Sequence, residues 1–310
     1  MHVALPDHAV VVEGDRIADV TTAPPADATQ LDMPGDVVLP GMINLHNHTL
    51  NAPVFRSIVD DLPRGGVGPS KVCSMLMPIG GLAVTAHSPD ELGDLVAVGL
   101  LEVARSGATT LVDQFRQRQA MILDLARAMG LRFYGAPHLF SPSDTKTDAE
   151  VARAARGSFE GASGLASFSD LHARHDGGAA GRLRVILGPH AADSCDPDLL
   201  QEADRLSREL DTMTLIHAAQ RQSEVDRVRE RHGVDVASYL ARNGLLRPRV
   251  ILAHGVFFSD DELARVVASG AGRFLRGDEA MIVARGAAAG SKLWALADAQ
   301  GMLPAALTRA

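Results

Sequence analysis

The chain contains 310 residues, a length that suggests one large domain or two smaller ones. Hydrophobic residues make up 46% and charged residues 22% of the sequence, which argues against a disordered, collagen-like or coiled-coil chain. Asp and Glu number 38 against 30 Lys and Arg. This balance argues against binding to nucleic acid, because phosphate contacts need clustered positive charge.

Cysteine content and hydropathy narrow the class of protein further. Cys73 and Cys195 are the two cysteines and form no Cys-x-x-Cys pair, which excludes a disulfide framework and a cysteine-based zinc site as organising features. No segment approaches about 18 uninterrupted apolar residues, and the N-terminus lacks a basic region followed by an apolar run. We therefore expect a cytoplasmic protein that does not bind membranes.

The N-terminal residues 1–37 predict a small β element ahead of a different architecture. Residues 9–13 and 16–20 are typical of strands and flank a Gly-Asp turn, and another strand is expected at 36–39 after a Pro/Ala linker. We place the domain boundary there, so that residues 38–310 form the second domain.

From about residue 38 onward, apolar runs bounded by turn residues alternate with segments of helical period. This alternation indicates βα units around a parallel sheet. Six strands are expected, at residues 42–45, 108–112, 131–135, 183–187, 212–216 and 249–253. Helices are expected at residues 89–106, 120–129, 198–210, 223–232 and 260–268, the last two beginning at the capping residues Ser223 and Ser259. We expect a long loop at 141–180 that carries a helix at 148–156.

No Gly-x-Gly-x-x-Gly or Walker A motif follows these strands, which disfavours an open nucleotide-binding sheet. We predict an α/β fold, namely a TIM-like (β/α) barrel, which needs about 250 residues. Only weak strands, at 273–275 and 281–284, follow the sixth unit, so the sequence leaves open whether the barrel is complete. An incomplete barrel would expose unpaired strand edges, and we then expect a homo-oligomer.

Five of the 12 histidines stand at or just after the C-terminal end of an expected strand, where α/β barrels place their catalytic groups. They are His46, His48, His190, His217 and His254. A His-x-His pair in an extended segment places both imidazoles on one face. Two more neutral imidazoles from neighbouring strands would complete a site suited to Zn2+, with Fe2+ as an alternative.

Other histidines lack this placement, and we expect them to be surface or loop residues. They are His87, His138, His172, His175 and His232.

The run from Leu39 to His48, LPGMINLHNH, resembles the signature of the amidohydrolase superfamily, specifically its cytosine deaminase, methylthioadenosine/S-adenosylhomocysteine deaminase and triazine hydrolase branch. The likeness continues in order at residues 55–62, 106–110, 188–191, 217–220 and 253–255. The resemblance implies a metal-dependent hydrolase that acts on carbon–nitrogen bonds other than peptide bonds, such as an amino group on a small heterocyclic substrate. It also implies that the N-terminal element is part of a small β-sandwich beside the barrel.

The resemblance implies a role for each candidate site residue. His46, His48, His217 and His254 would be metal ligands, while His190 would contact the substrate or polarise its leaving group. Gln220 occupies the position where the family usually carries a glutamate as proton shuttle, and its amide has no titratable proton at useful pH.

One family residue has no clear match in the sequence. The family's metal-binding aspartate follows the eighth strand, and Asp278 is the nearest candidate, but its sequence context differs and we expect a surface loop residue. Two functions therefore remain open. The chain is either an active hydrolase, which deaminates a heterocycle with a metal-activated water, or a truncated or degenerate relative that binds metal or a partner without turnover.

Overall fold

The computed structural model describes residues 5, 7–32, 38, 40–50, 53–54, 82, 84–115, 118–141 and 164–271. The chain divides into two units between Pro40 and Gly41. In the first unit, β1 (Ala9–Glu13) and β2 (Arg16–Thr21) form an antiparallel hairpin. Both strands were expected from the sequence, whereas the strand expected at 36–39 lies outside the described residues apart from Val38.

The second unit alternates parallel strands with helices. The elements of its first half are β3 (Met42–Asn47), α4 (Pro89–Arg105), β4 (Ala108–Phe115), α5 (Gln119–Ala128), β5 (Arg132–Leu139), α7 (Leu165–His175), α8 (Gly178–Gly181), β6 (Leu183–Val185) and β7 (Gly188–Pro189). Its second half consists of α9 (Pro197–Glu209), β8 (Thr214–Ala218), α10 (Gln222–His232), α11 (Val236–Arg242), β9 (Val250–His254) and α12 (Asp260–Ser269).

The strands form one curved parallel sheet. β3, β4, β5 and β6 pair in that order, β7 pairs with β5, and β8 pairs with β9. The Leu215 N–H donates to the Leu187 carbonyl at 2.8 Å, and a parallel bridge joins Ala191 to His217, so β8 continues the first group of strands. The sheet is curved so strongly that the ring centroids of His46 in β3 and His254 in β9 lie 5.0 Å apart. Such curvature of a parallel sheet is the geometry of a barrel wall.

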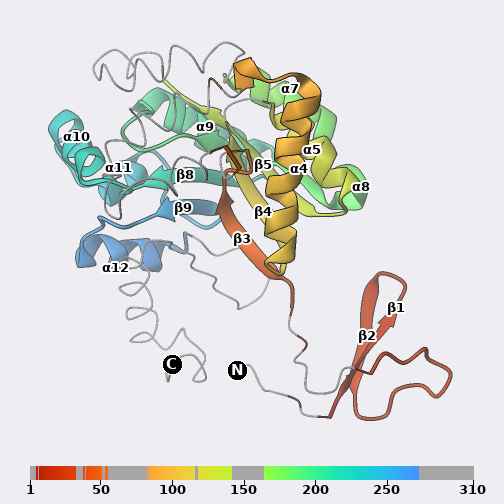
Figure 1. The fold of residues 1–310 in the computed structure, drawn as a ribbon. Coiled ribbons are helices and arrows are strands. Elements are labelled where there is room, and N and C mark those ends of the chain that lie inside the picture. Colours follow the sequence, from red (N-terminus) through yellow and green to blue (C-terminus); the bar gives the residue numbers. More distant parts are fainter. Residues whose placement is uncertain are drawn as a thin grey trace, which may run out of the picture. The chain divides into compact units, whose positions relative to one another are not determined.

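Two apolar layers hold this sheet. The inner layer is contributed by the strands and consists of Leu45, Val112, Ala136, Ile186, Leu215, Ile251 and Ala253. The outer layer joins the opposite face of β4, β5 and β6 to the helices α4, α5, α7 and α9 (Figure 1). Leu100, Ile122, Phe133 and Phe168 are buried in this layer. The strands are buried on both faces, which explains why they read as continuous apolar runs in the sequence.

The N-terminal caps of two helices can be compared with the capping residues predicted from the sequence. Ser259 forms a capping box with Glu262 at the start of α12, as predicted. The prediction for Ser223 is wrong, because α10 begins at Gln222 with Arg221 as its N-cap and Ser223 falls inside the first turn.

The prediction of a long loop at residues 141–180 is partly wrong. α7 occupies Leu165–His175 and buries Phe168, Leu171 and His175, whose spacing of three and four residues fits one helix face. Small and polar residues around this stripe hid it in the sequence. The helix expected at 148–156 and the strands expected at 273–275 and 281–284 lie outside the described residues.

Candidate metal centre

The four predicted metal ligands converge at the C-terminal ends of three strands. His46 lies in β3 with His48 directly after it, His217 lies in β8, and His254 ends β9. Ligand nitrogens of His46, His217 and His254 lie within 4.8 Å of one another. Nε2 of His48 lies 3.4 Å from Nε2 of His217. A single ion placed among these nitrogens would be within reach of several of them.

Backbone carbonyls set the tautomers of two of these imidazoles. Nδ1 of His48 contacts the Gln114 carbonyl, and Nδ1 of His217 lies 2.5 Å from the His190 carbonyl. A carbonyl oxygen only accepts, so each Nδ1 carries the proton and each Nε2 presents a lone pair. The two lone pairs face each other, an arrangement that a cation stabilises and that histidine ligands of metals commonly show.

The other two candidate ligands, His46 and His254, also offer nitrogen donors. Nδ1 of His46 and Nε2 of His254 are buried and have no hydrogen-bond partner among the residues that the structure describes. Burial, with the charge of neighbouring groups, lowers the pKa of His46 and His217 well below the ordinary value and that of His254 to about 4. These three imidazoles are therefore neutral at physiological pH, which is the form that coordinates zinc.

Asp113 in β4 holds the segment around His48, and sequence reasoning missed it. Its buried Oδ1 accepts hydrogen bonds from the Thr49 amide and hydroxyl, both at 2.7 Å, and from Asn47 Nδ2 at 3.4 Å. Burial raises the pKa of Asp113 to about 6. Asp113 thus fixes both neighbours of His48 while the carbonyl of the next residue, Gln114, orients the His48 ring. An aspartate within an apolar strand was the available signal, since it needs buried partners.

The backbone near His254 adopts uncommon conformations. His254 has φ 76° and Ala219 has φ 49°. Both lie in the left-handed region, which is unfavourable for residues other than glycine. The Gly255 N–H donates to the Ala218 carbonyl and the Phe257 N–H to the Ala219 carbonyl, each at 2.9 Å. These two bonds join the segments after β8 and β9 and keep His254 directed toward the other candidate ligands.

His190 lies beside the ligands, directly after β7. Its ring centroid is 5.1 Å from that of His217, and its Nδ1 is 2.7 Å from the Ser194 hydroxyl. Phe140 stacks on it at 4.4 Å. Gln220 follows β8 three residues after His217, and its backbone N–H donates to Glu224 at 2.9 Å. Asp278 lies outside the described residues.

A sixth imidazole, that of His138, lies at the centre and was not expected. His138 is only 2% exposed, and its ring lies 5.0 Å from His190 and 6.0 Å from His48, so the expectation of a surface or loop residue is wrong. The expected strand ended at Gly135, before a proline, whereas β5 continues to Leu139 and carries His138 to the ligand end of the sheet.

The same expectation, of a surface or loop position, is wrong for His175 and correct for His87. His175 is buried in α7, and burial lowers its pKa. His87 is exposed, as expected.

Comparison with known proteins places this geometry in a family. A family model described as the amidohydrolase family matches residues 37–299. The chain belongs to the amidohydrolase family. A 5'-deoxyadenosine deaminase from Methanothermobacter thermautotrophicus is 32% identical over 82% of this chain and 55% of its own length. A 5-methylthioadenosine/S-adenosylhomocysteine deaminase from Nitratidesulfovibrio vulgaris is 30% identical over 92% of this chain and 59% of its own length.

Solved structures confirm the barrel fold. An atrazine chlorohydrolase variant from Arthrobacter aurescens TC1, solved with zinc and atraton, superposes with a TM-score of 0.66 and 20% identity over 86% of this chain and 60% of that chain. The predicted resemblance and the predicted TIM-like fold are therefore confirmed. This amidohydrolase chain spans between 55% and 59% of the length of the two curated relatives. Among the described residues, no helix is long and apolar enough to cross a bilayer.

Proposed function

We propose that this amidohydrolase chain binds zinc through His46, His48, His217 and His254 and hydrolytically removes the exocyclic amino group of an adenosine-like nucleoside. The observation that carries the proposal is the convergence of these imidazoles, with the Nε2 atoms of His48 and His217 facing each other at 3.4 Å. The names of the two curated relatives support the substrate class, and the zinc of the chlorohydrolase structure supports zinc over iron.

The reaction exchanges a C–NH2 group for a carbonyl and releases ammonia. Zinc, when bound, supplies a water of lowered pKa at the position where the imidazoles converge. His190 lies beside His217 and would contact the purine ring, with the Ser194 hydroxyl holding its Nδ1. The Gln220 amide can orient the substrate by hydrogen bonding but transfers no proton near neutral pH. We assign the proton for the departing nitrogen to an imidazole, and His190 is suited to this by type and position.

The decisive experiment measures zinc content and ammonia release together. Purified protein is loaded with zinc, dialysed and assayed with 5'-deoxyadenosine, 5'-methylthioadenosine and S-adenosylhomocysteine, with cytosine and an aminotriazine as other heterocycles. We expect about one zinc per chain and ammonia release from at least one adenosine derivative. Ammonia release from cytosine or the aminotriazine alone would contradict the proposed substrate class. Protein that retains no zinc would contradict the metal centre.

Gln220 favours a second candidate, a metal-binding relative without turnover. Replacing Gln220 with Glu restores a carboxylate that can carry a proton, a role worth about 100-fold or more in rate where it operates. If this second candidate is correct, the zinc-loaded chain and its Gln220→Glu variant both release no ammonia. If the enzyme proposal is correct, we expect the variant to release ammonia at least about tenfold faster than the native chain.

A further inference from the structure

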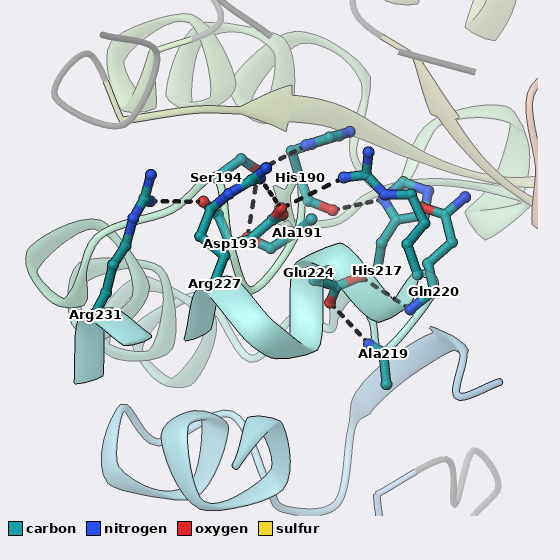
Figure 2. A network of polar contacts seen from close by, with 11 residues as sticks. His190, Ala191, Asp193, Ser194, His217, Ala219, Gln220, Glu224, Arg227 and Arg231 are labelled. Carbon is teal, nitrogen blue, oxygen red and sulfur yellow. Dashed lines mark hydrogen bonds and ion pairs between the residues drawn. The ribbon is translucent and has the colours of Figure 1, made fainter. Parts of the chain in front are cut away.

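Two loops beside the metal centre share one buried charge cluster. Asp193 lies three residues after His190, and Glu224 lies four residues after Gln220 in the first turn of α10 (Figure 2). Asp193 is 4% exposed and Glu224 is fully buried. Buried carboxylates are costly unless they are paired, so the partners of these two indicate what they hold in place.

Glu224 holds the loop that follows β8. Its Oε1 accepts the Ala219 N–H at 2.8 Å and its Oε2 accepts the Gln220 N–H at 2.9 Å. Ala219 has φ 49°, a left-handed conformation that surrounding contacts must maintain. The carboxylate therefore stabilises an unfavourable turn and fixes the backbone of Gln220 directly after the ligand strand.

Asp193 attaches the loop after β7 to the same helix. Its Oδ2 accepts hydrogen bonds from Arg227 and, at 3.4 Å, from Arg221, while its backbone carbonyl accepts one from Arg231 at 3.1 Å (Figure 2). The next residue is Ser194, whose hydroxyl contacts His190. A chain of contacts thus runs from α10 through Asp193 to the His190 ring.

We propose that Asp193 and Glu224, together with Arg221 and Arg227, form a clamp that positions His190 and Gln220 relative to the metal-binding histidines. The proposal rests on the function proposed above. All four side chains act on the two loops and none is a metal ligand. A buried ion cluster is a weak source of stability compared with apolar packing, so its place beside the centre is better explained by positioning.

The first test compares Glu224→Gln with Glu262→Gln. Glu262 is a matched control because it is also buried and accepts two backbone N–H groups, from Ser259 at 2.9 Å and Ala237 at 3.2 Å, but in α12. Glutamine can accept only one of the two N–H groups that glutamate accepts, since its NH2 end is a donor. We expect the Ala219 and Gln220 amides to exchange hydrogen at least about tenfold faster in Glu224→Gln and to be unchanged in Glu262→Gln.

The catalytic readout separates positioning from a purely structural role. In Glu224→Gln we expect unchanged zinc content, KM within about threefold and kcat lowered by about tenfold or more, because small misplacements of catalytic groups have large effects on rate. Glu262→Gln should keep kcat. Unchanged kcat in Glu224→Gln, or an equal loss in both variants, would overturn the clamp.

A second pair of variants covers the case in which Glu224→Gln does not fold. The Arg227 side chain is 20% exposed, so Arg227→Met removes its charge at a tolerant position, and Arg174→Met removes the exposed partner of Asp170 as control. We expect lower kcat at constant zinc in Arg227→Met alone, and equal kcat in both would overturn the proposal. If native zinc-loaded protein releases no ammonia, the proposed function fails, while amide exchange of residues 219–220 in Arg227→Met still decides whether the clamp holds the loop.

Discussion

His217 occupies the middle of the candidate metal centre. Its ring lies 4.8 Å from His46, 5.2 Å from His254 and 5.5 Å from His48, and its Nδ1 is held by the His190 carbonyl. We expect His217→Ala to weaken zinc binding by more than about 100-fold, because loss of even an outer partner of a ligand costs about 10 to 100-fold. Zinc content after dialysis against a weak chelator measures this.

His87→Ala is the matched control for that measurement, since His87 is exposed and lies before α4. It should retain about one zinc per chain under the same dialysis. Equal zinc content in the two variants would show that His217 is not a ligand.

The lowered pKa values predict acid sensitivity of the metal-free protein. In the unfolded chain a histidine titrates near pH 6.5, whereas His254 in the folded site has a pKa of about 4. The unfolded state therefore binds protons first, and stability that is present above pH 6.5 is lost as the pH falls toward 4. His254 alone accounts for about 3 kcal/mol at most.

Urea unfolding of zinc-free protein at pH 7.5, 6 and 5 measures this loss. His254→Asn, which removes one of the neutral imidazoles, should show a shallower pH dependence. If the native chain and the variant have the same pH dependence, the folded His254 pKa is not lowered.

The convergence of the five candidate site histidines could be predicted because each stands at or just after the end of a recognisable strand, and strand ends coincide in a parallel barrel. His138 could not be predicted, since the end of β5 is set by pairing of Gln114 with Ala136 and of His138 with Gly188 across the sheet. Asp193 and Glu224 were missed for a related reason. They meet only because the loops after β7 and β8 are neighbours in the folded chain.

At the scale of elements, α4 packs closely against the segment after β3, which carries His48 and Thr49, because it has a glycine at the contact. A Cβ on Gly99 would lie 2.2 Å from the Thr49 carbonyl oxygen, whereas a Cβ on Gly93 of the same helix would have no atom within 4 Å. We expect Gly99→Ala to destabilise the protein by about 1–3 kcal/mol through overpacking. It should also weaken zinc binding, since Thr49 adjoins His48.

Gly93→Ala is the internal control, and it should stabilise the helix by up to about 1 kcal/mol. Urea unfolding of both zinc-free variants provides the comparison. A Gly99→Ala protein as stable as Gly93→Ala would show that α4 does not approach Thr49 this closely.

The sequence predicted elements best where a single periodicity dominated. α4 and α9 match their expected ranges within one residue at each end, because an apolar stripe and an N-terminal cap coincide. The strand expected at 183–187 instead ends at Val185 as β6, and β7 begins only at Gly188. Between them, the Ile186 N–H donates to the Gly135 carbonyl and the Leu187 N–H to the Met213 carbonyl, which lie on opposite neighbours. α11 was missed because seven residues give too few turns to show a period.

At the scale of the whole second unit, the candidate ligands join the first described strand to the last. His46 lies in β3, His48 directly follows it, and His254 ends β9, yet these two strands are not hydrogen-bonded to each other among the described residues. Among the described residues, β3 and β9 meet in the inner apolar layer, which includes Leu45 and Ala253, and through the rings of His46 and His254. The expectation of a homo-oligomer concerns the same two edges and stays a prediction, for which light scattering is the measurement.

Zinc should consequently stabilise the entire barrel rather than one loop. Free zinc at about 1,000 times its dissociation constant adds about 4 kcal/mol to the unfolding free energy, if it binds only the folded chain. We expect the Tm to rise by about 10 °C on zinc addition and to fall again on chelation. In His254→Ala the ion no longer contacts β9, and the rise should shrink to a small fraction. An equal rise in this variant would mean that zinc stabilises the chain without joining β3 to β9.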